Sequence, residues 1–274
     1  MNILTIDLEE WFNILNFDYS NYKKYKRIEH NTECLIQLLK ENNTKATFFI
    51  LASLAKEYKQ LITLLSKDFD IGIHGFSHQP LSLLTNKEIK NDILRAKNTI
   101  EEITNKKVNK YRAPGFSIPS IETFNILAQC GIEVDSSASC LNHFYGKKII
   151  DTDQPLIINT NYGEIKELPP TAFNVCGIKG FLGGGYFRIM PYSLIKYLSK
   201  KKNDNLLFYI HPRDIDNKQP KIKELPLFQK YKAYVGLNSS KSKLKKYLQD
   251  FKFVDISTAM NDIDWQNAKK INLL

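Results

Sequence analysis

No apolar run in the sequence approaches the roughly 20 residues that a membrane-spanning helix requires. The sequence also lacks internal repeats, low-complexity segments and any linker that would divide it. The signature of a nucleic-acid-binding module is absent as well. These absences argue against a transmembrane protein, a repeat protein and a nucleic-acid binder. They predict that residues 1–274 form a single domain.

Cysteine is scarce in this chain. The four cysteines, Cys34, Cys130, Cys140 and Cys176, are widely separated and lack the spacing of a zinc site. We therefore predict that they are reduced, as cysteines usually are in the cytoplasm. The first apolar segment begins at the N-terminus, which leaves no room for a secretory signal before it. The sequence thus predicts a cytoplasmic location.

Positive charge is in excess. The formal net charge is +10, and lysines crowd residues 196–202 and 241–246, while a hydrophobic content of 43% is enough for a sizeable core. The simplest interpretation is a solvated, lysine-rich surface. The alternative is attraction to an anionic partner, such as a nucleotide sugar, a lipid-linked phosphate or a membrane surface.

Apolar strands alternate with amphipathic helices through residue 135. Strands are predicted at the N-terminus and at 45–51, 70–73 and 132–135, and a further strand is predicted to end in residues 111–114. Helices are predicted at 32–42, around 61–65, at 85–103 and at 121–130, with Thr85 and Glu88 as a capping box. This alternation predicts a parallel sheet with helical crossovers. The pattern then loosens into short segments at 156–159 and 165–168, followed by strands at 205–210 and near Phe253 and helices at 190–199 and 242–249.

Three carboxylates follow the first strand. Asp7, Glu9 and Glu10 lie within four positions at the end of an apolar run. Residues at the C-terminal end of a buried strand are delivered to one mouth of the fold. The carboxylates would repel one another unless a cation lies among them, and a divalent metal ion is the simplest partner. The alternative is an acidic turn on the surface.

His74 and His78 follow the short strand 70–73. On a helical turn, a spacing of four places both imidazoles on one face, about 5–6 Å apart at Cβ, which suits one metal ion. The alternative is a pair of histidines that are hydrogen-bonded in the core. Because the chain has only five histidines and two of them are here, we favour metal binding.

Two more polar side chains arrive at strand ends. Arg112 is followed by Ala113-Pro114, and the proline stops the segment from continuing. Its guanidinium is either a partner for a carboxylate such as Asp7 or an ordinary surface group. His211 comes directly after strand 205–210, with Asp214 and Asp216 near enough to orient its imidazole. The alternative for His211 is a capping role in a loop.

The order of these motifs resembles the polysaccharide deacetylase family, also called family 4 carbohydrate esterases or the NodB-homology domain. The matching segments are TIDLEE from Thr5, KATFFI from Lys45, HGFSH from His74, YRAPGFS from Tyr111, VDSS from Val134 and YIHP from Tyr209. Two further segments, ELPP from Glu167 and GGGYFR from Gly183, resemble a branch associated with bacterial exopolysaccharide loci.

The resemblance implies an α/β fold, a distorted (β/α) barrel with fewer than eight regular strands. It also implies a divalent metal ion, with zinc as our prediction, held by one acid and two histidines. The positions that match the family's site are Asp7 as catalytic base, Arg112 as the residue that holds the base, His211 as general acid, and His74 and His78 as metal ligands.

The acid ligand is where the sequence departs from the family's pattern. The usual second aspartate is replaced by Leu8, which cannot bind a metal ion. Some branches place the acid one position later, which makes Glu9 the expected ligand and Glu10 the fallback. On a regular strand Asp7 and Glu9 share a face while Glu10 points away, and this favours Glu9.

The resemblance implies removal of an N-acetyl group from an amino sugar during the biosynthesis of a surface glycan, namely a capsule, an O-antigen or an exopolysaccharide. We expect an N-acetylated sugar as partner, carried on a nucleotide or a lipid or free, with substrate contacts from Pro114, Phe116, Tyr186 and Arg188. The aromatic side chains among these would serve equally well as core. Two alternatives stay open: hydrolysis of a non-sugar C–N amide bond, and a non-catalytic carbohydrate-binding relic.

Overall fold

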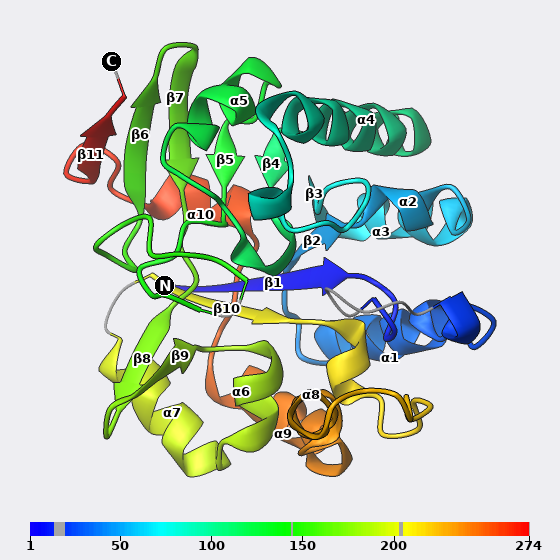
Figure 1. Cartoon of the computed structure of the whole chain (residues 1–274). Coiled ribbons are helices and arrows are strands. Elements are labelled where there is room, and N and C mark those ends of the chain that lie inside the picture. Colours follow the sequence, from blue (N-terminus) through cyan, green and yellow to red (C-terminus); the bar gives the residue numbers. More distant parts are fainter. Residues whose placement is uncertain (14–19, 144, 203–204, 274) are drawn as a thin grey trace.

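A nine-stranded sheet, in the order β10-β1-β2-β3-β4-β5-β7-β6-β11, runs through the protein (Figure 1). The structure is a computed structural model and describes residues 1–13, 20–143, 145–202 and 205–273. Residues 14–19, between the first predicted strand and the first predicted helix, lie outside the described residues. The strands of the sheet are β1 (Asn2–Leu8), β2 (Thr47–Ile50), β3 (Asp70–Ile73), β4 (Lys110–Tyr111), β5 (Val134–Asp135), β6 (Leu156–Thr160), β7 (Gly163–Glu167), β10 (Leu206–Ile210) and β11 (Lys269–Asn272).

From β10 to β7 every neighbouring pair of strands is parallel, whereas β6 is antiparallel to β7. A separate hairpin pairs β8 (Ala172–Val175) with β9 (Ile178–Phe181). The α-helices are α1 (Ile28–Glu41), α2 (Ala52–Ala55), α3 (Lys59–Asp68), α4 (Asn86–Thr104), α5 (Thr123–Gln129), α6 (Gly184–Ile189), α7 (Tyr192–Lys201), α8 (Leu227–Tyr234), α9 (Leu237–Asp250) and α10 (Ile256–Asp262). Four 3₁₀ turns complete the fold: η1 (Ser20–Tyr22), η2 (Leu81–Leu83), η3 (Pro114–Phe116) and η4 (Pro212–Ile215).

The helix predicted at 85–103 illustrates how local sequence sets a boundary. The Thr85 hydroxyl accepts the Glu88 backbone N–H at 3.4 Å, and the Glu88 carboxylate accepts the Thr85 N–H at 2.8 Å. This capping box satisfies two donors that the first turn of α4 would otherwise leave free. At the other end, Asn105 adopts the left-handed conformation with φ 53° and stops the helix.

The C-terminal third departs most from the sequence prediction. The predicted strand near Phe253 is wrong: Val254 makes a single isolated bridge to Ile3, and the last strand is β11. Elements α6, α8, α10 and the β8–β9 hairpin were not predicted. The glycine run that begins at Gly183 leads into α6 and passes close to β10. A Cβ at Gly183, which has φ 150°, would lie 2.3 Å from the Tyr209 carbonyl oxygen.

The barrel closes through a loop rather than a ladder of strands. Thr171, just beyond β7, donates its backbone N–H to the Leu207 carbonyl at 3.3 Å, and its hydroxyl accepts the Leu207 N–H at 2.7 Å. After the β8–β9 hairpin, Gly183 forms a parallel bridge to Tyr209 of β10. These contacts join the segment after β7 to the β10 edge, which gives the α/β fold and the distorted barrel that the motif order predicts.

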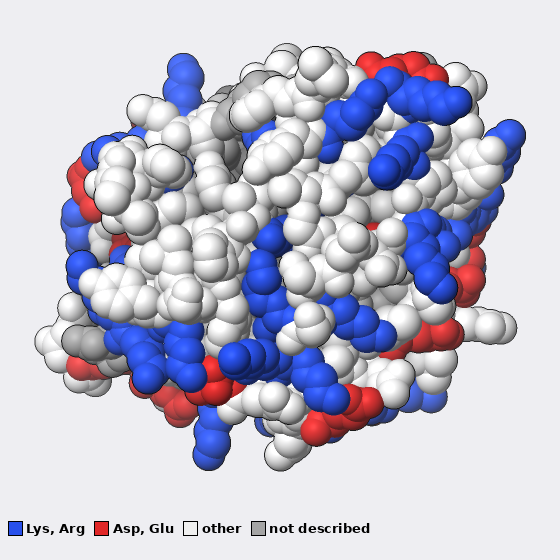
Figure 2. Space-filling view, turned by 90° about the horizontal axis from the view of Figure 1, so that it is seen from below, with Lys and Arg blue, Asp and Glu red and all other residues white. Residues whose placement is uncertain are grey.

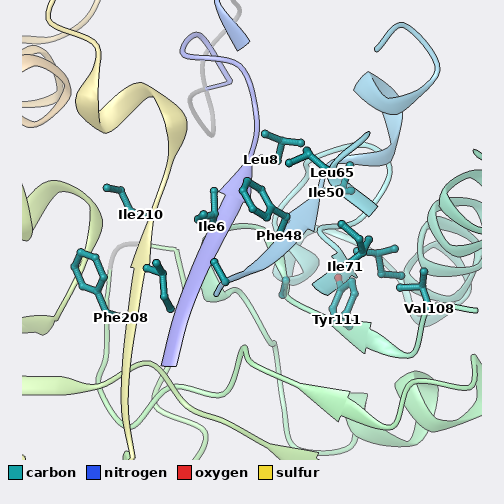
Figure 3. Close-up of a cluster of buried hydrophobic side chains, with 14 of the residues drawn as sticks. Ile6, Leu8, Phe48, Ile50, Leu65, Ile71, Val108, Tyr111, Phe208 and Ile210 are labelled. Atoms are coloured by element: carbon teal, nitrogen blue, oxygen red, sulfur yellow. The ribbon is translucent and has the colours of Figure 1, made fainter. Parts of the chain in front are cut away.

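Alternation along β1 separates two environments. Leu4, Ile6 and Leu8 pack in the larger core beneath the helices, together with Phe48 and Ile50 of β2 (Figure 3). Ile3 packs instead in a second cluster with Phe49 and Leu207. Because side chains alternate along a strand, Asp7 shares the face of Ile3 and points into the barrel. None of the helices in the described ranges combines the length and apolar character needed to cross a lipid bilayer.

Two carboxyl groups face each other inside this sheet. Asp135 of β5 and Glu167 of β7 are register partners, both fully buried. Asp135 accepts from Ser137, and Glu167 accepts the Ala138 N–H at 3.0 Å. Burial and the adjacent Asp135 raise the pKa of Glu167 well above its ordinary value, and Glu167 Oε2 has no hydrogen-bond partner among the described residues. Both observations favour a proton shared by the two carboxyl groups.

This shared proton predicts a pH dependence of stability. The unfolded chain releases the Glu167 proton near pH ~4.3, whereas the folded chain keeps it, so the unfolded state binds fewer protons above that pH. The free energy of unfolding should therefore fall by up to about 1.4 kcal/mol per pH unit as pH rises. In Glu167→Gln, whose amide needs no proton, the fall should disappear, as denaturant unfolding at a series of pH values would show. Glu164→Gln, an exposed position on the same strand, is the control. Parallel curves for the parent and Glu167→Gln would contradict the shared proton.

Candidate active site

Asp7 and Arg112 form a buried ion pair inside the barrel. Arg112 Nη1 lies 2.8 Å from Asp7 Oδ1, and neither side chain is more than 3% exposed. The guanidinium also donates to the Thr5 hydroxyl and to the carbonyl and hydroxyl of Ser136, and it lies 4.4 Å from the centre of the Phe49 ring. With its donors committed in this way, Arg112 fixes the orientation of the Asp7 carboxylate.

Glu9, His74 and His78 converge beside this pair. Each is buried and offers one ligand atom, and the three atoms lie within 4.8 Å of one another. His74 Nδ1 donates to the Arg112 carbonyl at 2.9 Å, which leaves Nε2 with its lone pair. Burial lowers the pKa of His74 to about 4, so that its imidazole is neutral near pH 7, the form that binds metal ions.

The two histidines do not lie on a helical turn, contrary to the prediction. Residues 74–78 form a loop in which Gly75 and His78 have φ values of 72° and 57°. The Asp92 carboxylate of α4 holds this loop by accepting the backbone N–H groups of Phe76 and Ser77 at 2.7 and 2.9 Å. The centres of the two imidazole rings are nevertheless 5.5 Å apart, because the loop turns back on itself.

Glu9 and Glu10 have different surroundings. The Glu9 carboxylate contacts His78 Nε2 and lies 3.6 Å from His211 Nε2. The Glu10 carboxylate turns away from the histidines and accepts the backbone N–H groups of Arg27 and Ile28 at the start of α1. A carboxylate at a helix N-terminus is favoured by the exposed N–H groups there. Glu9 is therefore placed as a candidate ligand, whereas Glu10 anchors a helix.

The two neighbouring glutamates give a matched pair of variants. Glu9→Gln should lower the metal content of the purified protein and leave the free energy of unfolding of the metal-free chain nearly unchanged. Glu10→Gln should keep the metal and lose about 1–3 kcal/mol of unfolding free energy, because charge-assisted hydrogen bonds at the start of α1 are weakened. Elemental analysis and denaturant unfolding measure the two effects. Metal loss in Glu10→Gln alone would contradict this assignment.

His211 lies on the other side of the carboxylates. Its Nε2 is 3.9 Å from Asp7 Oδ2, and its Nδ1 is 3.0 Å from Asp214, which is in turn 2.8 Å from Arg188 Nε. Burial by itself lowers the pKa of His211, but the hydrogen bond and charge of Asp214 and the charges of Glu9 and Asp7 outweigh it and raise the pKa to about 9. The imidazole thus carries a proton near neutral pH and can donate it from Nε2.

Asp214 and Asp216, both considered from the sequence as partners of His211, have separate roles. Asp214 accepts a hydrogen bond from His211 Nδ1. Asp216 instead forms an ion pair with Arg27 and accepts a hydrogen bond from the Asn31 side chain at 3.0 Å. Arg188, predicted to contact substrate, is buried and donates to the carbonyl oxygens of residues 232, 233 and 235. Arg188 therefore positions Asp214, and it also lines the pocket that opens over Glu9 and His211.

A pocket of about 160 Å³ opens over Glu9 and His211. Residues that line it and that sequence reasoning missed are Tyr145, Gly185, Arg213, Phe228, Gln229, Lys232 and Ala233. The other predicted substrate contacts are not among its lining residues. Phe116 packs against Phe181 and Tyr209, Tyr186 packs edge-on against Phe173, and Pro114 is buried. A larger cleft of about 470 Å³ between α1 and α9 holds none of the converging residues.

Two family models together match most of this sequence. Residues 9–134 match the family model described as polysaccharide deacetylase, and residues 136–261 match one described as a domain of unknown function, DUF3473. The chain therefore carries a polysaccharide deacetylase domain over residues 9–134. The first match contains Glu9, His74, His78 and Arg112, and the second contains His211, so that the candidate site draws on both matched regions.

Proteins with the designation polysaccharide deacetylase resemble this chain in part of its sequence or in its fold. The Bacillus subtilis (strain 168) protein named "Putative polysaccharide deacetylase YheN" is 32% identical over 97 residues, which cover 35% of this chain and about a third (34%) of that protein. A crystal structure from Mycobacterium smegmatis with the same designation shares the fold with a TM-score of 0.67 at 17% identity, over 100% of this chain and 93% of the other.

Activity is not uniform among proteins of this fold. A Bacillus anthracis protein described as a CE4 family pseudoenzyme, BA3943, has a TM-score of 0.53 at 16% identity, over 99% of this chain and 69% of the other. A mutant of that protein is described as having restored enzymatic activity and has a TM-score of 0.52. At this level of identity the likeness shows the fold alone.

Proposed function

We propose that this chain, which carries a polysaccharide deacetylase domain, is a metal-dependent hydrolase that removes an N-acetyl group from an amino sugar. The observation that carries the proposal is the convergence, in one site, of a carboxylate fixed by Arg112, an imidazole with a carboxylate partner, and the cluster of Glu9, His74 and His78. A candidate base, a candidate acid and a candidate metal-binding set are the parts that amide hydrolysis needs.

The cluster suits a divalent metal ion such as Zn²⁺. One carboxylate and two imidazoles form a three-ligand set that leaves room for water or substrate. The hydrogen bond from His74 Nδ1 to the Arg112 carbonyl fixes the tautomer in the way that metal-binding histidines usually require. When bound, such an ion would polarise the amide carbonyl and lower the pKa of water near it.

Asp7 and His211 supply the proton transfers. The free oxygen of the Asp7 carboxylate faces the site, while Arg112 holds the other, so that Asp7 is placed to take a proton from the attacking water. His211 is protonated near neutral pH and exposes Nε2 toward the same space, so that it is placed to give a proton to the departing amine. Acetate and a free amino sugar are the products.

The setting we propose is synthesis of a surface glycan in the cytoplasm, on a sugar carried by a nucleotide or a lipid phosphate. The four free cysteines agree with a reducing compartment, and the net charge of +10 agrees with an anionic carrier. Activity on a carrier-linked sugar should then exceed activity on the free sugar and fall with added salt, as charge is screened. Equal, salt-independent rates would remove the carrier and leave the deacetylase.

Acetate and free amine, measured together, test the proposal. The protein is treated with chelator, restored with Zn²⁺ and incubated with N-acetylglucosamine oligosaccharides and with a panel of non-sugar amides. Acetate and amine released in equal amounts from a sugar support the proposal. Release from a cyclic amide alone would favour the non-sugar hydrolase, and no release from any substrate by metal-loaded protein would favour a non-catalytic relic.

A further inference from the structure

Helix α8 exposes large apolar side chains beside the active-site pocket. Leu227 is 85% exposed, Phe228 68% and Tyr231 56%, on a helix of 8 residues. Leu227 and Tyr231 are four residues apart and therefore share a helix face. Single exposed apolar residues are ordinary, but three on two turns form a patch of the kind that marks an interaction surface.

The C-terminal half of α8 is hydrogen-bonded to a residue of the candidate active site. The Arg188 guanidinium donates to the carbonyl oxygens of Lys232 at 2.7 Å and of Ala233 at 2.9 Å, at the C-terminal half of the helix. Arg188 also pairs with Asp214, the partner of His211. Phe228 and Lys232 themselves line the pocket. Whatever binds the exposed face of α8 is therefore held at the mouth of the site.

Lysines are frequent in the segment that carries the patch. The segment 218–232 contains five lysines, at positions 218, 221, 223, 230 and 232, against one acid, Glu224. Helix α9 begins at Leu237, just after α8 ends, and adds the exposed Lys241 and Lys245. Figure 2 shows the molecule from the side of α7, α8 and α9, where Lys and Arg form bands across the face and acidic residues lie mostly toward its rim.

We propose that α8 binds the surface of an anionic lipid bilayer, with Leu227, Phe228 and Tyr231 inserted among the head groups and the surrounding lysines next to the lipid phosphates. Apolar and aromatic side chains within a basic surround are the pattern of interfacial membrane binding. A protein partner that buried this face would have to accept five lysines, whereas an anionic bilayer matches the charge and the apolar side chains together. Such docking would present the pocket to lipid-linked sugars, a consequence that rests on the proposed function.

Sedimentation with vesicles tests the docking surface independently of activity. The full chain is mixed with vesicles of phosphatidylcholine alone or with added phosphatidylglycerol. Binding is expected only with phosphatidylglycerol and should weaken with salt. The double variant Leu227→Ser/Tyr231→Ser should lower the partition coefficient about tenfold or more, because two apolar contacts are lost. Leu64→Ser, which changes a leucine that is 60% exposed on α3, should bind like the parent.

Several outcomes would overturn the docking surface. These are no binding to anionic vesicles, equal binding by the double variant, or a change of oligomeric state in the double variant during gel filtration, which would identify a second copy of the chain as the occupant. Circular dichroism verifies that the double variant is folded. Vesicle binding without acetate release from any substrate would leave the surface standing and remove the proposed function.

Discussion

His74→Ala and His78→Ala are each expected to leave the purified protein nearly free of metal and without measurable acetate release. The two imidazoles and Glu9 form the proposed three-ligand set, and a site with three protein ligands has none to spare. Loss of a partner outside the ligand set already costs about 10–100-fold in metal affinity, so that loss of a ligand should cost at least about a hundredfold. Elemental analysis and equilibrium dialysis with Zn²⁺ measure this directly.

His30→Ala is the matched control for the histidine variants. His30 lies exposed on α1, away from the cluster, and its removal should change neither metal content nor acetate release. Chelator should reproduce the His74→Ala phenotype in the parent protein, and Zn²⁺ should reverse it in the parent alone. A His74→Ala protein that keeps its metal and its activity would refute the assignment of the ligands.

Asp7→Asn is expected to slow acetate release by about 10²–10⁴-fold, the usual contribution of a general base. The amide keeps the size of the carboxylate and can still accept from Arg112 at the position that Oδ1 occupies. The free energy of unfolding will still fall, because the buried guanidinium loses its counter-charge. Metal content should stay near that of the parent, which separates this variant from those of the ligand set. A rate within tenfold of the parent would show that another group takes the proton.

Regular elements and the residues at their ends could be predicted from the sequence. Asp7 and Arg112 are 105 residues apart, yet Asp7 lies near the C-terminal end of β1 and Arg112 directly follows β4, and in a parallel sheet such ends meet on one side. The choice between Glu9 and Glu10 as the acid near the histidines followed from the two-residue period of a strand, although β1 ends at Leu8.

Contacts made by irregular segments could not be predicted. The pairing of Arg188 with Asp214 depends on α6, a helix that starts in a glycine run and carries no helical signal. The loop of His74 and His78 is shaped by Asp92, whose place on α4 gives no hint of its backbone partners. Likewise α8 has no apolar stripe facing a core, because its large apolar residues face outward.

The relation between bound metal and acetate release is the most direct test of metal-dependent deacetylation. Chelator-treated protein is titrated with Zn²⁺, and both the metal bound per chain and the rate of acetate release from an N-acetylated oligosaccharide are followed. If one metal site per chain catalyses the reaction, the rate should rise in proportion to bound metal and reach a plateau at about one ion per chain, as a single three-ligand site requires. A full rate in metal-free protein, or a plateau of bound metal without acetate release from any N-acetylated sugar, would contradict it.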